Sequence, residues 1–152
     1  MKKLFAIALA LVLVASLSVT AFAANTTGGN TNITTSIEPT YTVTIPANTN
    51  VNFNATKTTF GAIEVTASQI HPDKQIRVTL TTDGELNNSI DTNKVIPYVI
   101  KDADGKAFTT ATYLTEGDKT ELAIHITAED WNAAYAGDYS DTVTFTVSYE
   151  SK

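Results

Sequence analysis

Cysteine is absent from this sequence of 152 residues, so neither a disulfide nor a thiolate zinc site can stabilise the fold. The same absence excludes catalysis by a thiol. There are only 2 histidines, and a transition-metal site would need scattered carboxylates to complete it. We therefore expect a fold held by its core alone, with no metal and no cofactor.

Basic residues are scarce, with 10 Lys and Arg against 16 Asp and Glu and a formal net charge of −6. An acidic surface repels the phosphates of nucleic acids and of anionic membranes. The composition therefore predicts a partner that is neither a nucleic acid nor a membrane.

Long apolar runs are also lacking, except at the start of the chain. Lys2 and Lys3 precede an apolar stretch over residues 4–14, and Ala21 and Ala23 form an A-x-A cleavage pattern. This arrangement predicts a signal peptide over residues 1–23, and a retained membrane helix is the alternative. Removal of the signal peptide takes away Lys2 and Lys3, and the formal net charge becomes 8 − 16 = −8. We expect a protein that is secreted, extracellular or displayed at the cell surface.

The next segment, "ANTTGGNTN" (residues 24–32), is polar and contains a glycine pair, which is typical of a flexible leader. From residue 33 to residue 152, apolar and polar residues alternate through most of the chain. The sequence therefore predicts a single folded domain over residues 33–152 after the leader.

The alternation has the period of a β-strand and is clearest at the end, in "YSDTVTFTVSYE" (residues 139–150). Six further segments show it: "NITTSIEP", "TYTVTIP", "NVNFN", "FGAIEVTA", "QIRVTL" and "TELAIHITA". One segment favours a helix, since Thr127 and Asp130 resemble a capping pair and Gly137 is placed to end the turn. Eight or nine short strands with one helical turn predict an all-β, antiparallel β-sandwich.

Residues 95–100 depart from simple alternation because neither face is polar. Such a strand is covered on both sides or lies beside another subunit. Pro97 lacks a backbone donor, which favours a sheet edge or a bulge. Ile96, Tyr98 and Ile100 are therefore candidates for an assembly edge.

The stretch "WNAAYAGDYSDTVTFTVSYE" resembles the carboxyl ends of bacterial fimbrial subunits and of spore coat protein U type secreted domains. The resemblance implies an immunoglobulin-like sandwich and a surface-exposed or polymer-forming role. Tyr139 resembles the tyrosine corner of such domains. The chain departs from these families in having no cysteine, and it lacks an LPxTG-type sorting motif.

In pilin-like subunits, a neighbour's amino-terminal extension fills a gap in the sandwich, as an unpaired edge permits. The candidate donor in this chain is "NITTSIEP", with Ile33 and Ile37 as the inserted side chains. The alternative, which we favour from the sequence, is that this segment is an edge strand of its own domain. Expected partners are thus the chain itself or other surface proteins.

No arrangement of residues indicates catalysis, because no serine lies on a nucleophile elbow and Glu129 and Asp130 are adjacent rather than convergent. "DADG" (residues 102–105) resembles the start of a calcium loop, but a turn is the favoured interpretation. We expect a non-enzymatic structural or adhesive module. A carbohydrate-binding module that stacks a glycan on Trp131 and Tyr135 is the alternative, although such a pair more often closes the end of a sandwich.

Overall fold

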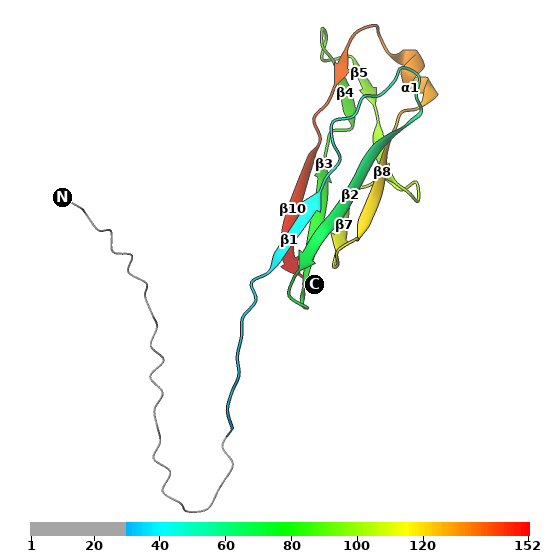
Figure 1. Ribbon diagram of the computed structural model, residues 1–152. Helices are drawn as coiled ribbons and strands as arrows, with labels where there is room; N and C mark the ends of the chain where they lie inside the picture. Colours follow the sequence, from blue (N-terminus) through cyan, green and yellow to red (C-terminus); the bar gives the residue numbers. More distant parts are fainter. Residues whose placement is uncertain (1–29) are drawn as a thin grey trace, which may run out of the picture. The chain divides into compact units, whose positions relative to one another are not determined.

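The computed structural model describes residues 30–152, and it is an all-β, antiparallel sandwich with one short helix (Figure 1). The predicted signal peptide and most of the predicted leader lie outside the described residues. Residues 30–35 have no regular secondary structure and exposed side chains. The fold is formed within residues 36–152.

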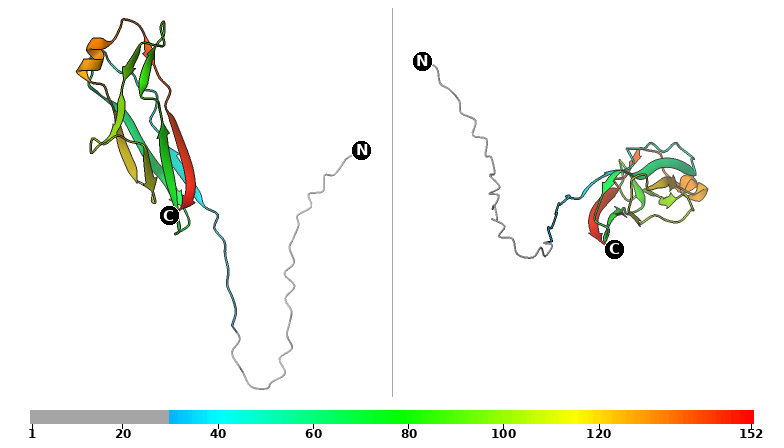
Figure 2. Two further views of the ribbon diagram at one scale, coloured as in Figure 1. Left: turned by 180° about the vertical axis from the view of Figure 1, so that it is seen from behind. Right: turned by 60° about the horizontal axis from the view of Figure 1, so that its bottom comes forward.

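Three antiparallel sheets make up the fold. In spatial order, the first has four strands: β1 (Thr40–Thr44), β2 (Lys57–Gln69), β8 (Lys119–His125) and β6 (Val99–Asp102). The second has three strands: β10 (Thr144–Ser151), β3 (Lys74–Thr81) and β7 (Thr110–Tyr113). A small third sheet consists of β5 (Val95–Pro97), β4 (Glu85–Asn88) and β9 (Tyr139–Ser140). Figure 2 shows the two larger sheets as opposing layers.

The core lies between these layers, and the alternation in the sequence places its residues correctly. Ile63 and Val65 on β2 are fully buried, as are Ile76 and Val78 on β3. Leu122 on β8 completes the pattern at 2% exposure. Threonines fill many outward positions, where the branched carbon favours extended backbone and the hydroxyl stays hydrated.

Residues 95–100 form two strands, because the chain passes from the third sheet to the first at Tyr98. Pro97 is the last residue of β5, which lies at the edge of the third sheet, as the missing backbone N–H of proline predicted. The buried Tyr98 hydroxyl donates to the carboxylate of Asp141 and hydrogen-bonds with Thr82 Oγ1 at 2.7 Å. Three segments that are far apart in the sequence thus meet at one phenol.

Two predicted strands are not formed. Residues 33–38 have no strand, so the interpretation of "NITTSIEP" as an edge strand of its own domain is wrong. Residues 51–54 lead into a turn, in which Asn54 has a φ of 64° and Phe53 is 77% exposed. In both segments the alternating residues lack a neighbouring strand to pair with, and alternation alone does not supply one.

The one helix of the described residues, α1 (Ala128–Ala133), has Thr127 as its N-cap, and Thr127 and Asp130 form the predicted capping pair. Thr127 Oγ1 accepts from the Asp130 backbone, and the Asp130 carboxylate accepts from the Thr127 backbone. The predicted role of Gly137 is wrong, because the helix ends four residues earlier. Gly137 has a φ of 147°, and a Cβ there would lie 2.5 Å from Nδ2 of Asn88, so glycine permits the side chain of Asn88, at the end of β4, to lie close to this loop.

We predict that Tyr98→Phe lowers the free energy of unfolding at pH 7 by about 2 kcal/mol, because a buried hydrogen bond to a carboxylate is lost. Burial is the main cause that raises the pKa of Tyr98, and the hydrogen bond to Asp141 raises it further. This raised pKa favours the neutral phenol in the folded state. The stabilisation is therefore complete below about pH 10, the unfolded value, and declines as the pH rises further.

Urea unfolding at pH 7 and at pH 11 measures both effects. Tyr135→Phe is the matched control, because the Tyr135 side chain is 63% exposed. Equal stability of Tyr98→Phe and the unaltered protein at pH 7 would contradict the assignment.

Candidate functional site

The sandwich is open along one side, where β1 and β10 lie next to each other at the edges of opposing sheets (Figure 1). β1 pairs only with β2, and β10 pairs only with β3, among the described residues. We call this side the seam and define it by Tyr41, Phe60, Phe145, Val147 and Tyr149.

The free edge of β10 presents unpaired backbone groups. The Lys152 amide donates to the Asp73 carbonyl at 3.0 Å, and the register of β10 on β3 runs without a break from Thr144↔Thr81 to Ser151↔Lys74. In an antiparallel ladder, alternate residues bond to the same neighbour. The even-numbered residues therefore bond to β3, and the amides and carbonyls of the odd-numbered ones point away from it.

The strand order shows which position is empty. In a seven-strand immunoglobulin-like sandwich, one sheet has the order A-B-E-D and the other has C-F-G. In this chain β1-β2-β8-β6 follow the first order, and β3 with β10 take the places of C and F. The second sheet departs from the pattern at its other edge, where β7 pairs with β3 on the side away from β10. No strand within residues 30–152 takes the place of G, beside β10.

Aromatic side chains from both sheets fill the space beside this empty position. The rings of Tyr41 and Tyr149 have centroids 5.7 Å apart, and those of Phe60 and Phe145 are 6.0 Å apart. These contacts join β1 and β2 to β10 without a backbone bond. Tyr41 and Val147 remain 36% and 37% exposed, so the seam is an apolar surface that water still reaches.

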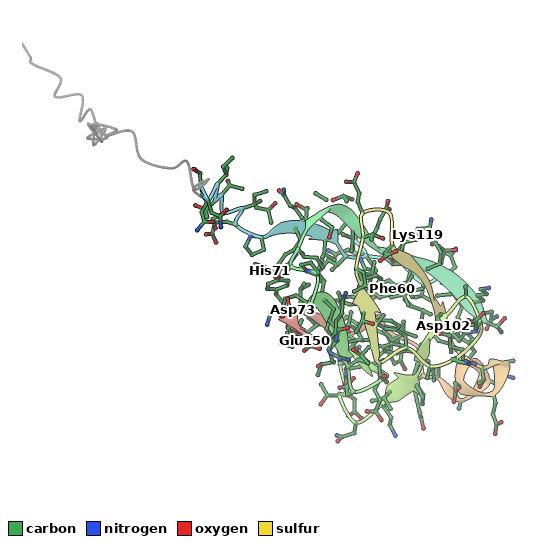
Figure 3. All side chains as sticks on the ribbon, turned by 90° about the horizontal axis from the view of Figure 1, so that it is seen from below. Phe60, His71, Asp73, Asp102, Lys119 and Glu150 are labelled. Carbon is green, nitrogen blue, oxygen red and sulfur yellow. The ribbon has the colours of Figure 1, made fainter. Side chains whose placement is uncertain are left out.

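Polar contacts fix the carboxyl end of β10 against β3. Glu150 Oε1 accepts from Arg77 Nε at 2.6 Å and from Gln75 Nε2 at 3.0 Å. Both bonds lower the pKa of Glu150, and the bond from Arg77 has the larger effect. The Tyr149 hydroxyl accepts from the His71 amide at 3.0 Å. Figure 3, seen from below, shows Glu150 and His71 on the same side of the sandwich.

The structure places the other candidate edge residues in the core rather than at a surface. Ile96, Tyr98 and Ile100 are only 1%, 7% and 3% exposed. The outward residue between the last two, Val99, is 43% exposed. An assembly contact at β5 or β6 would therefore use the backbone or Val99, and not the three predicted side chains. Ile33 and Ile37, by contrast, are 97% and 63% exposed.

The two candidate stacking residues do not form one aromatic platform. Trp131 is partly buried against the core, and its Nε1 donates to the Ala55 carbonyl at 3.0 Å. Tyr135 lies beyond the end of α1, with Lys94 Nζ 4.6 Å from its ring centre. Trp131 thus closes the end of the sandwich. Tyr139 forms the expected corner, since its hydroxyl donates to the Tyr135 carbonyl at 3.0 Å.

The "DADG" segment is a turn, as favoured from the sequence. Asp102 Oδ1 accepts from the backbone amides of Asp104 and Lys106, and Gly105 has a φ of 80°. Among residues 30–152, no group of three or more His, Asp or Glu side chains is arranged to hold a metal. That part of the chain also has no helix long and apolar enough to cross a membrane.

The sequence did not identify the seam as a candidate site. Phe60 packs against the core and Phe145, although strict alternation with Ile63 and Val65 would point it outward, because the pairing of β2 with β8 shifts register between Thr59 and Gly61. This bulge reverses which residues of β2 face the core, so that even-numbered Phe60 and odd-numbered Ile63 lie on the same side. Glycine within a strand is the local indication of such a bulge. The meeting of β1 with β10 is a tertiary property that strand periodicity does not contain.

No family model matches this chain, and no curated protein is detectably similar to it.

We predict that Trp131→Phe lowers the free energy of unfolding by about 1–2 kcal/mol, because the Ala55 carbonyl loses its donor. Tyr135→Ala changes it by less than about 0.5 kcal/mol, since an exposed side chain makes few contacts. Urea denaturation followed by far-ultraviolet circular dichroism measures both. The opposite order of effects would contradict the structural role of Trp131.

Proposed function

We propose that this protein is an exported, non-enzymatic structural or adhesive subunit of a bacterial surface or extracellular assembly, in which copies associate through strand edges. The observation that carries the proposal is the free edge of β10 beside an apolar seam, at the position where an immunoglobulin-like sandwich has its G strand. An edge of this kind accepts any strand of matching alternation.

The donor in this proposal is residues 33–38 of another copy. This segment has no strand in the structure, and its two isoleucines are exposed. Residues four apart in a strand point to the same face at a separation of about 13 Å. Ile33 and Ile37 therefore have the same spacing as Phe145 and Tyr149 on β10. Each isoleucine would lie beside one end of the seam, with Thr35 beside Val147.

The carbohydrate-binding alternative has less support. Stacking on a sugar requires an accessible ring face, and the Trp131 ring is packed against the core and Phe53. Tyr135 is accessible but already has the Lys94 ammonium at its ring.

Export predicts a defined amino terminus. When the full chain is expressed with a functioning bacterial secretion system, the mature protein should begin at Ala24, after the A-x-A pattern. Intact-mass spectrometry of the extracellular fraction measures this terminus. Recovery of the full-length chain in the membrane fraction would favour a retained anchor instead.

Strand donation predicts that the mature protein self-associates and that Ile33→Ser/Ile37→Ser abolishes this, because two buried isoleucines are lost from each contact. Val147→Lys should have the same effect, since a charge in the seam opposes pairing of β10. Light scattering coupled to size-exclusion chromatography measures the oligomer over a range of concentrations.

Val99→Ser is the matched control, because Val99 is 43% exposed but lies on β6, at the far edge of the first sheet. It should leave the oligomer unchanged. A mature protein that stays monomeric at every concentration would contradict the assembly proposal. Loss of the oligomer in the control as well would place the contact elsewhere.

A further inference from the structure

Three loops converge at the end of the sandwich that carries α1 (Figure 1). The first loop contains Phe53, whose ring packs edge to face on Trp131 of α1 at 5.6 Å. The second joins β4 to β5 and contains Ile90. It is tied to the third, which follows α1, by the Ser89 amide donating to the Asp138 carbonyl at 2.8 Å. The first loop thus contacts α1, and the second loop is bonded to the third, so segments that are widely separated in sequence lie at this end.

Each loop exposes one large apolar side chain at this end. Phe53, Ile90 and Tyr135 are 77%, 87% and 63% exposed, and we call these three residues the loop end. Among the large apolar side chains of residues 36–152, those of Ile90 and Phe53 are the most exposed. Single exposed apolar residues are ordinary, but three on adjoining loops at one end of a sandwich are typical of a contact surface.

These loops are held in place by polar contacts. Asn88, only 3% exposed, accepts through Oδ1 from the amides of Ile90 at 2.9 Å and Asp91 at 3.2 Å. Its Nδ2 lies against Gly137. A single buried side chain thus supports both the loop that bears Ile90 and the loop that follows Tyr135. A surface that is already ordered loses little conformational entropy when a partner binds.

The summed charge of the segments that form this end of the sandwich is negative. Within residues 46–56, 89–94 and 127–138 the acidic residues are Asp91, Glu129, Asp130 and Asp138, and the basic residue is Lys94. Their sum is 1 − 4 = −3. The Lys94 ammonium lies over the Tyr135 ring, at 4.6 Å, and thus beside an apolar residue of the loop end. A partner that complements this surface is cationic and carries apolar side chains.

We infer that the loop end is a binding surface for a polypeptide segment rich in lysine or arginine and in aliphatic side chains. The apolar side chains of the partner pack on Phe53, Ile90 and Tyr135, and its cations face the surrounding carboxylates. This surface is distinct from the seam in both residues and chemistry. Its occupation does not depend on the assembly proposed above.

The probe for this inference is a soluble nine-residue peptide in which lysine, leucine and glycine alternate. It is titrated into the ¹⁵N-labelled mature protein, and amide shifts are followed by NMR. The shifts should be confined to the three loops. Ile90→Ser/Tyr135→Ser should weaken binding roughly fivefold, since the apolar contacts of two exposed side chains are lost. These two residues are exposed, so the variant should fold normally, and its own spectrum verifies that.

Three controls separate specific binding from general attraction to an acidic protein. Val99→Ser/Leu114→Ser removes two other exposed apolar side chains, 43% and 45% exposed, and should leave the affinity unchanged. A peptide with serine in place of leucine should bind weakly and without localised shifts. A peptide with glutamate in place of lysine should not bind. Shifts spread over the acidic surface, equal affinity for the serine peptide, or no binding would overturn the inference.

Discussion

The structure depends on the antiparallel ladder between β10 and β3. This ladder runs through eight residue pairs without a bulge, and it fixes which side chains of β10 face the opposing sheet. A shift of one residue would turn Phe145 and Tyr149 outward and Thr146 and Ser148 inward. The ring contacts with Phe60 and Tyr41, and therefore the seam, exist only in the observed register. The Arg77–Glu150 pair lies diagonally across the ladder, since Arg77 is opposite Ser148 and Glu150 is opposite Gln75.

The two edges that border the seam are protected to different degrees. β1 is five residues long, is interrupted by a register shift between Thr42 and Val43, and has Pro39 and Pro46 on either side. Short length, bulges and proline are devices by which sheet edges resist pairing. Residues 144–149 of β10 have neither proline nor charge. An incoming strand would therefore extend the sheet of β10, and contact β1 through side chains alone.

Local sequence determines much of the fold but little of the candidate site. The buried positions of β2, β3 and β8 follow from alternation, and the start of α1 follows from the Thr127 and Asp130 pair. Residues 33–38 and 51–54 alternate equally well but form no strand, because a strand needs a partner and the pattern does not name one. Ile96, Tyr98 and Ile100 were candidates for an assembly edge because their neighbours are apolar too. β5 and β6 are indeed edge strands, but these three side chains face the core, and the change of sheets at Tyr98 is a property of the topology.

The seam and the loop end lie in different parts of the domain, and this separation has a consequence for any assembly. A donated strand beside β10 would cover residues 144–151, whereas the loop end is built on residues 46–56, 89–94 and 127–138. Asn88 and Trp131 stabilise these loops from within the domain, without help from the strand position beside β10. A subunit could therefore be joined to its neighbour through the seam and still present Phe53, Ile90 and Tyr135. Repetition of subunits along an assembly would raise the effective concentration of this surface. A weak contact at each loop end would then suffice for firm attachment to a partner with repeated basic segments.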